Sequence, residues 1–420
     1  MNLFRDIESA IRRLPRNVWV VTAASFLTDV SSEMVFNFLP LFLANVLGVR
    51  LGIVGLIEGI AETTASIVKM YSGWFSDWLG KRKWLTIAGY SLSTVAKPFL
   101  FFAGTWVGVL AIRFTDRLGK GIRTAPRDAL IADSVSEKRR GLAFGLHRAG
   151  DTAGAALGLS IALFVVWYVQ GLKLELGRET FQLLALISVI PAVLAVIILI
   201  VGVKEIGGTK TSRESPSVSF KGLGRGFGTF LLSVIVFTLG NSSDAFIILR
   251  AQERGLNLVG IISMLIVFNL LYALVAGPAG ALSDRINRRT MIVVSWLAYA
   301  VIYAGLALAN SAWHVWVLFA IYGIYYGSTE GVSRALVADL VGADRRGSAY
   351  GVYNAAIGFS VLPASVIAGL LWQGIGSWQG LGASAPFIFG AAMALLAAGI
   401  LFFLPGFGGR VSTSNTAFLE

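Results

Sequence analysis

Long runs of apolar residues, broken by short polar segments, recur along the whole chain. We predict twelve membrane-spanning helices from them, because each run can cross the hydrocarbon core of a bilayer as a helix. The predicted spans cover residues 18–44, 52–76, 84–104, 106–131, 142–168, 181–203, 227–249, 257–282, 290–309, 313–338, 348–373 and 385–404. The fourth span breaks the pattern, since its charged residues would hide it from a plot of hydrophobicity alone.

Composition supports an all-α polytopic membrane protein. Of the 420 residues, 56% are hydrophobic and only 14% are charged, whereas a soluble protein would carry about 25% charged residues. The 48 glycines are in keeping with closely packed transmembrane helices. Cysteine is absent, which excludes disulfides, thiolate chemistry and Cys-ligated metals. We expect no cofactor.

The net charge of +12 is distributed as in a membrane protein. Lys and Arg gather in short loops on one side of the predicted spans, so the positive-inside rule places both termini in the cytoplasm and the chain in the cell (inner) membrane. Residues 1–17 read as an amphipathic helix on the cytoplasmic face, and residues 405–420 as a cytoplasmic tail. We therefore expect a lipid bilayer around the chain, no nucleic-acid partner, and a monomer.

The two halves of the sequence repeat. ALIADSVSEKRRGLAFG (129–145) matches ALVADLVGADRRGSAYG (335–351), and GWFSDWLGKRK (73–83) matches GALSDRINRR (280–289). Gly80 aligns with Asn287, another residue that tolerates a positive φ. We predict six-helix bundles at 18–203 and 227–404, related by a pseudo-two-fold axis and joined by a polar cytoplasmic linker at 204–226.

These motifs resemble those of the major facilitator superfamily. Its G-x-x-x-D-x-x-G-[RK]-[RK] loop signature is present as Gly73, Asp77, Gly80, Lys81, Arg82 and Lys83, and recurs in weaker form around Asp284. The resemblance implies alternating access between two halves, with Asp77 and Asp284 pairing across the cytoplasmic interface. With their repeat neighbours they form the predicted conformational gate: Gly73, Asp77, Gly80, Arg82, Asp133, Arg140, Asp284, Arg288, Asp339 and Arg346.

The fourth span carries the sharpest chemical signal. Arg113, Arg117, Lys120 and Arg127 fall near one helical face, and each such charge costs about 2.5–3.5 kcal/mol at the centre of a bilayer-spanning helix. Arg117 and Gly121 resemble the family's R-x-x-x-G pattern, which implies a link to proton coupling near an acid of the first span. The cations either bind an anionic group or control a proton, or they form a salt-bridged stripe that only pins spans 1, 2, 4 and 5 together.

Carboxylates occupy the first two spans. Asp29 and Glu33 share one face of span 1, either as proton carriers or as ionised partners that neutralise Arg113 and Arg117. Glu58 and Glu62 share a face of span 2, where a structural ion pair is also plausible. We assign proton coupling to Asp29, Glu33, Glu62 and Arg117. His147 lies near a helix end and is given no special role.

The second half is poorer in charge and richer in aromatic residues. Asp244, in the segment NSSD, mirrors Glu33, and Glu330 lies four residues before Arg334 on span 10. We predict a substrate cavity formed by Arg113, Lys120, Asn241, Asp244, Tyr322, Tyr326 and Glu330. The aromatic members are equally compatible with helix packing.

The sequence favours a secondary transporter and not an enzyme. It contains no Walker phosphate loop, and no nucleophile–His–acid set falls at a common depth. The first hypothesis is proton-coupled efflux of a small amphipathic or drug-like solute. A second is transport of an organic or phosphorylated anion on the cations of span 4. A third is a transporter-like receptor or scaffold.

Overall fold

The computed structural model describes residues 13–136, 139–205, 223–283, 286–341 and 346–403. The predicted amphipathic segment, the linker and the tail fall mostly outside these residues, as does Asp284. The side chains of Asp77 and Arg346 are likewise outside the description. Within the described ranges the chain is a bundle of long helices.

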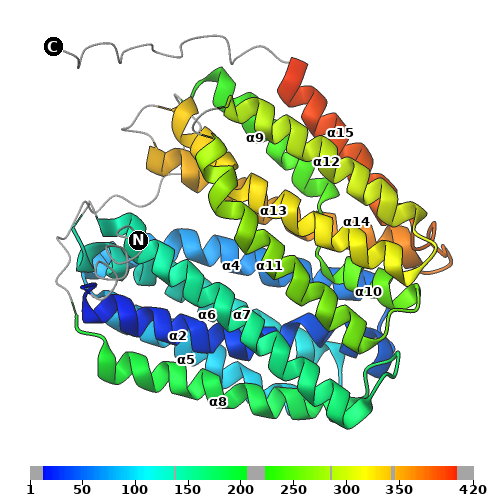
Figure 1. The fold of residues 1–420 in the computed structure, drawn as a ribbon, viewed down its shortest axis with the longest axis horizontal. Coiled ribbons are helices and arrows are strands. Elements are labelled where there is room, and N and C mark those ends of the chain that lie inside the picture. The colour runs from blue at the N-terminus through cyan, green and yellow to red at the C-terminus, as the bar shows by residue number, and fades with distance from the viewer. Residues whose placement is uncertain (1–12, 137–138, 206–222, 284–285, 342–345, 404–420) are drawn as a thin grey trace, which may run out of the picture.

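The first group of helices forms the lower part of Figure 1. Its first predicted span consists of α2 (Arg16–Glu33), η1 (Phe36–Phe38), α3 (Leu39–Leu41) and η2 (Phe42–Val46). The others are α4 (Leu51–Leu79), α5 (Arg82–Ala96) with η3 (Lys97–Phe102), α6 (Trp106–Ser134), α7 (Arg140–Gln170) and α8 (Arg178–Gly202).

The second group forms the upper part of the same view. Its first span is split into α9 (Gly224–Gly240) and α10 (Ala245–Glu253). It continues with α11 (Leu258–Ser283), α12 (Arg288–Leu308), α13 (Ala312–Leu340), α14 (Arg346–Gln373) and α15 (Ala385–Phe403).

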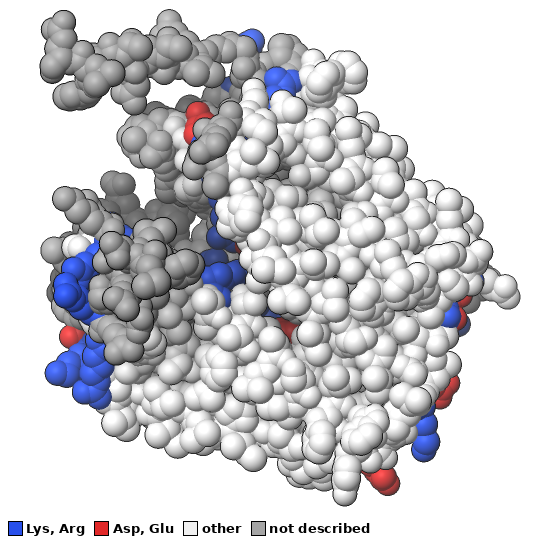
Figure 2. All heavy atoms as spheres, viewed as in Figure 1, with Lys and Arg blue, Asp and Glu red and all other residues white. Residues whose placement is uncertain are grey.

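Ten stretches of the described chain are long and apolar enough to cross a membrane by length and composition, and α6 and α13 are not among them. Both have 29 residues, which at about 1.5 Å per residue exceeds the thickness of the hydrocarbon core. The charged residues of α6 make it too polar to be recognised in this way, as expected from its sequence. Tyrosine and tryptophan lower the hydropathy of α13. The surface in Figure 2 agrees with a membrane setting: a broad uncharged belt separates charged residues at its two ends.

Three predicted spans are interrupted. Span 1 leaves the α-helix after Glu33, span 3 turns into the 3-10 segment η3 at Lys97–Pro98, and span 7 breaks at residues 241–244. Proline removes a backbone donor and disfavours helix in the residue before it. In span 1 the break follows VSSE, and in span 7 it coincides with the aligned segment NSSD; the short polar side chains of both segments compete for backbone hydrogen bonds. The mirror relation between Glu33 and Asp244 thus places both carboxylates at helix breaks.

The helix ends that carry Lys81–Lys83 and Arg288–Arg289 are called the basic end below, and the opposite ends the far end. At the basic end the repeat produces two equivalent ion pairs. Arg82 pairs with Asp133 in the first half, and Arg288 pairs with Asp339 at 2.6 Å in the second. Each joins the start of one helix to the end of the next.

Two turn predictions from the repeat have different outcomes. Gly80 ends α4 in the left-handed conformation, with φ 63°, as expected for a glycine that closes a helix. The suggestion of a positive φ at Asn287 is wrong, because its φ is −59°. Its side chain instead accepts a hydrogen bond from the Arg289 amide and caps α12.

The two halves meet most closely at the far end, between α4 and α14. The glycines Gly52, Gly55 and Gly59 let these helices touch through their backbones: a Cβ added to Gly55 would lie 2.1 Å from the Ser365 carbonyl oxygen. Leu51 N donates to Gln373 Oε1 at 2.7 Å, and Thr63 Oγ1 donates to the Gly358 carbonyl at 2.6 Å. The contact closes the far end, whereas Figure 2 shows a hollow with basic side chains between the halves at the opposite end.

Candidate functional site

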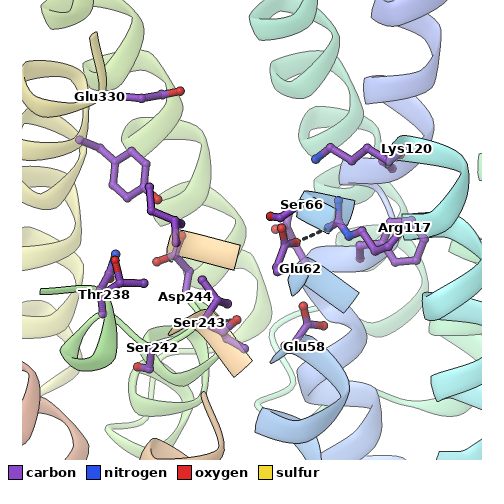
Figure 3. A pocket seen from close by; sticks show the side chains of 18 of the residues that line it. Glu58, Glu62, Ser66, Arg117, Lys120, Thr238, Ser242, Ser243, Asp244 and Glu330 are labelled. Atoms are coloured by element: carbon purple, nitrogen blue, oxygen red, sulfur yellow. Dashed lines mark hydrogen bonds and ion pairs between the residues drawn. The ribbon is translucent and has the colours of Figure 1, made fainter. Parts of the chain in front are cut away.

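A cavity of about 560 Å³ lies between the two halves. Its walls come from both: α2, α4 and α6 face α9, α10 and α13, and α12 and α14 contribute further side chains. Figure 3 shows Glu58, Glu62, Arg117 and Lys120 on one wall, opposite Thr238, Asp244 and Glu330. Most of the residues expected to bind solute or protons therefore converge on one space: Asp29, Glu33, Glu62, Arg113, Arg117, Lys120, Asn241, Asp244, Tyr326 and Glu330.

Arginines of α6 are held by carboxylates of α4. Arg113 Nη2 lies 2.8 Å from Glu58 Oε2, with both side chains almost fully buried. One turn further along each helix, Arg117 Nη2 lies 3.0 Å from Glu62 Oε1, the pair drawn with a dashed line in Figure 3. The i, i+4 spacing on both helices makes this a two-rung ladder. The alternative in which Asp29 and Glu33 neutralise these arginines is wrong, because α4 and not α2 supplies the ion-pair partners.

The two carboxylates of α2 are thereby left without an ion pair to the described arginines of α6. Glu33 accepts a hydrogen bond from Asn37 Nδ2 at 2.7 Å. In the described part of the chain neither Asp29 nor Glu33 forms an ion pair within 4.0 Å. A carboxylate inside a membrane protein that is not held in an ion pair can be neutralised by a proton. These two acids are therefore suited to take up and release protons at the cavity wall.

Lys120, also predicted to line the cavity, is not held by a carboxylate as Arg113 and Arg117 are. Its side chain projects into the cavity in Figure 3 and makes no ion pair with any described residue. It lies on the same wall as the Arg117–Glu62 rung. An ammonium group in this position can meet a solute or a nearby carboxylate, but the structure does not tie it to one.

The second half contributes an aromatic wall. Asp244, at the start of α10, accepts a hydrogen bond from Tyr322 Oη at 3.2 Å. Tyr322 was predicted to line the cavity, but it is fully buried and is not among the lining residues. It stacks with Tyr325 at a centroid distance of 5.6 Å, and Tyr325 and Tyr326 line the space instead. Tyr322 thus packs behind Tyr325, on the side away from the cavity.

Sequence reasoning missed Lys97. This fully buried side chain donates to Ser31 Oγ at 2.5 Å and Ser32 Oγ at 3.1 Å. Ser32 lines the cavity, and Ser31 donates onward to the Ser188 carbonyl at 2.5 Å. Lys97, at the end of α5, thus holds the last turn of α2 next to α5. Ser31 links the same turn to α8. The signal that could have found it is a lone lysine inside an apolar span.

Residues that could hold a metal are not grouped. Among the described residues no three His, Cys, Asp or Glu side chains form such a cluster. The chemistry of the site rests on carboxylates, ammonium and guanidinium groups, hydroxyls and aromatic rings.

The comparisons with known proteins agree with this architecture. The model of the Major Facilitator Superfamily matches residues 21–247 and again 226–417. The chain belongs to this superfamily. It is a transporter and not an enzyme. An uncharacterized MFS-type transporter of Methanocaldococcus jannaschii is 35% identical to it over 94% of this chain and 96% of that protein.

More distant relatives extend the comparison. A multi-drug resistance efflux pump of Streptococcus pneumoniae, PmrA, is 24% identical over 74% of this chain and 78% of the pump. A crystal structure of a bacterial homolog of the human lysosomal transporter Spinster, inward-facing and occupied, superposes with a TM-score of 0.73. That superposition covers 92% of this chain and 95% of the other at 15% identity, and it bears on the fold alone.

Proposed function

We propose that this MFS transporter exports a small amphipathic solute, neutral or cationic, in exchange for protons. The single observation that carries the proposal is the excess of acid in the cavity. Its lining contains seven carboxylates, Asp29, Glu33, Glu58, Glu62, Asp116, Asp244 and Glu330, against four cations, Arg113, Arg117, Lys120 and Arg123. Such a surface favours positive charge, whether it arrives as solute or as proton.

Polarity divides between the walls in a way that suits an amphipathic solute. The α2–α4–α6 wall provides charge, and the opposite wall provides Phe237, Trp296, Tyr325 and Tyr326. A flat apolar body can pack on these rings while its polar end meets the acids. The relative named as a multi-drug efflux pump adds weight to export as the direction.

Asp29 and Glu33 are the proposed proton carriers, since neither has a cation partner. Glu62, by contrast, is paired with Arg117 at 3.0 Å. Loss of the proton from α2 would leave a negative charge that attracts Lys120 on the same wall or a cationic solute in the cavity. The charge balance of the wall would then differ between the loaded and the empty carrier.

We further propose that the halves 18–203 and 227–404 rock about the cavity, with the linker 204–226 and both termini in the cytoplasm. The α4–α14 contact would then be the closed extracellular gate. The pairs Arg82–Asp133 and Arg288–Asp339 would belong to the cytoplasmic gate together with Gly73, Asp77, Arg140, Asp284 and Arg346. A functioning gate argues for a carrier and not for a receptor or scaffold.

The anion hypothesis has less support from the geometry. Two of the three cations that it relies on, Arg113 and Arg117, are already engaged by carboxylates. Only Lys120 of that set is unpaired in the described chain. An anion would also have to enter a space in which acids outnumber bases.

Proteoliposomes test the proposed function. Ethidium and tetraphenylphosphonium, two amphipathic cations, would be offered with and without a pH gradient, and an internal pH dye would record proton movement. We expect solute-driven proton flux in the wild type and its loss in Asp29→Asn or Glu33→Gln. Glu179→Gln, an exposed acid in the first turn of α8, is the matched control. Unchanged coupling in both α2 variants would overturn the assignment.

A further inference from the structure

A buried polar cluster lies outside the cavity, between α2, α5, α6 and α7. Ser25 is at its centre: its hydroxyl lies 2.7 Å from Tyr90 Oη and 3.0 Å from His147 Nε2, and it accepts from Arg127 Nη1 at 3.2 Å. On the other side of its ring, His147 Nδ1 lies 3.4 Å from Asp151 Oδ2. None of these five residues is among those that line the cavity.

The cluster is adjacent to the proposed proton carrier. Ser25 and Asp29 are four residues apart on α2, so they lie on the same face one turn apart. The helices α2 and α7 are in backbone contact here: a Cβ on Gly154 would lie 2.4 Å from the Phe26 carbonyl oxygen. Asp29 and Asp151 are close enough for their charges to interact. Asp151 Oδ1 is buried and has no hydrogen-bond partner.

The second half of the protein carries different residues at the equivalent positions. Counted from the first residue of each helix, Tyr90, Arg127, His147 and Asp151 correspond to Trp296, Ser333, Tyr353 and Ile357. Trp296 stacks on Phe237 at 4.9 Å, and Tyr353 stacks on Phe230 at 6.0 Å. In the second half these positions thus hold two aromatic residues, a serine and an isoleucine, and all four line the cavity. The first half places a histidine–carboxylate pair there instead.

We propose that His147 and Asp151 form a second proton-holding site, which receives the proton that Asp29 gives up; this rests on the proposed proton coupling. No hydrogen bond joins these two described acids, so the proton passes through an intervening water: the O–H bond of the Asp29 carboxylic acid breaks, the water takes that proton and gives up another, and an O–H bond forms on Asp151. Asp29 becomes negative as Asp151 becomes neutral. His147 accepts that proton at Nδ1 when Asp151 releases it, and the ring then carries the positive charge.

Other charged groups define the surroundings of the pair. Arg127 of α6 and Arg148 of α7 interact with both His147 and Asp151. Asp128 of α6 interacts with Asp151, and Tyr90 of α5 reaches His147 through Ser25. From the other half, Tyr272 of α11 and Glu330 of α13 contact Arg148. In α8 the ionisable residues Arg178 and Glu179 lie at the opposite end.

This arrangement gives the carrier a place to store a proton away from the solute. A proton on Asp29 faces the cavity, whereas a proton on the His147–Asp151 pair lies behind α2. Transfer between the sites would let the cavity change its charge without direct contact with bulk water. Solute and proton would then occupy different places during the same half-cycle.

Proteoliposomes with the probe that the wild type carries, ethidium or tetraphenylphosphonium, test the proposal through two readouts. One is solute-driven proton flux, and the other is exchange of labelled for unlabelled probe at equal pH on both sides. His147→Gln keeps a group that can bond Ser25, and Asp151→Asn keeps the shape of the carboxylate, but neither can hold a proton. We expect proton flux to fall about tenfold or more in each, with exchange retained.

The control is Glu179→Gln, an exposed acid in the first turn of α8 and away from the cluster, which should lose neither readout. Equal loss of flux and exchange in His147→Gln and Asp151→Asn would mean a structural role and overturn the proposal. Normal proton flux in both variants would overturn it as well, while the function proposed above would stand. Absence of proton flux in the wild type would overturn both the proposed proton coupling and the second proton-holding site.

Discussion

Arg113 and Glu58 form an almost fully buried ion pair between α6 and α4, at 2.8 Å. Only one oxygen of Glu58 is used, since its Oε1 has no hydrogen-bond partner, and Arg113 also lies 3.9 Å from Asp116. The Arg113 guanidinium stacks over the Phe36 ring at 4.4 Å, which links the pair to the broken part of the first span. The pair therefore joins three segments around the cavity.

Breaking this pair from one side should destabilise the protein strongly. In Arg113→Gln the Glu58 carboxylate stays buried without its cation, and we expect a loss of about 3–5 kcal/mol. Glu58→Gln should cost a similar amount, because it leaves the Arg113 guanidinium buried without its carboxylate. The double variant should be more stable than the sum of the single effects, because it removes both charges. Unfolding in detergent, followed by tryptophan fluorescence, measures the cycle; additive effects would contradict a coupled pair.

The glycine contact between α4 and α14 should control which end of the protein is open. Gly55→Ala puts a methyl group 2.1 Å from the Ser365 carbonyl oxygen, so the helices must separate at the far end. We expect the far-end-open state to gain population. Because the chain has no cysteine, a single Ile248→Cys in the cavity wall can report this through an impermeant maleimide.

Gly351→Ala on α14 is the matched control, since a Cβ there meets nothing within 4 Å. Labelling of Cys at position 248 from the far end should be slow in the wild-type background and in the control, and faster in Gly55→Ala. Equal labelling of all three would show that the α4–α14 contact is not the gate.

Elements and repeat were predictable from sequence because they depend on local patterns. Apolar runs identify the helices, and the repeat places Asp133 and Asp339 at equivalent positions, although it did not predict their pairs with Arg82 and Arg288. Pairing inside the bundle was not predictable. Asp29–Glu33 and Glu58–Glu62 have the same spacing, and only tertiary packing decides that α4 supplies the partners of the α6 arginines.

The misplacement of Tyr322 and the omission of Lys97 have related causes. A tyrosine on an aromatic helix face can point toward the cavity or toward the next helix, and the neighbours that decide this come from distant segments. Tyr322 is held behind the wall by its bond to Asp244. Lys97 stands in an apolar stretch whose polar partners, Ser31 and Ser32, lie on another helix.

Lys120 offers a test of solute charge. It lines the cavity without an ion pair in the described chain, so its ammonium repels a cationic solute and attracts an anionic one. Lys120→Gln should tighten binding of tetraphenylphosphonium by up to about tenfold, given charge separations of several ångströms at intermediate dielectric. Isothermal titration in detergent measures the change, and Lys69→Gln, outside the cavity lining, is the control. Weaker binding in Lys120→Gln would favour an anionic solute group.

The two halves are also joined near the basic end, through Glu330. Its carboxylate lies 3.6 Å from Arg148 of the other half and 3.1 Å from Arg334 on its own helix. Tyr272 Oη donates to the same carboxylate at 2.8 Å and is in contact with Arg148 as well. Glu330 also lines the cavity. The contact between the halves therefore shares a side chain with the proposed site.

Removal of Arg148, which contacts Glu330 from the other half, should let the halves move apart more freely at the basic end. Removal of Arg334, which lies on the same helix as Glu330, should not. Both arginines are largely exposed, with side-chain exposures of 58% and 56%, so each pair contributes about 1 kcal/mol or less. Arg148→Gln should still widen the spin-label distance distribution between Ser134→Cys on α6 and Leu340→Cys on α13. Arg334→Gln removes an equal charge beside the same acid but crosses no interface. If both variants widened the distribution alike, the effect would belong to Glu330 itself and not to a contact between the halves.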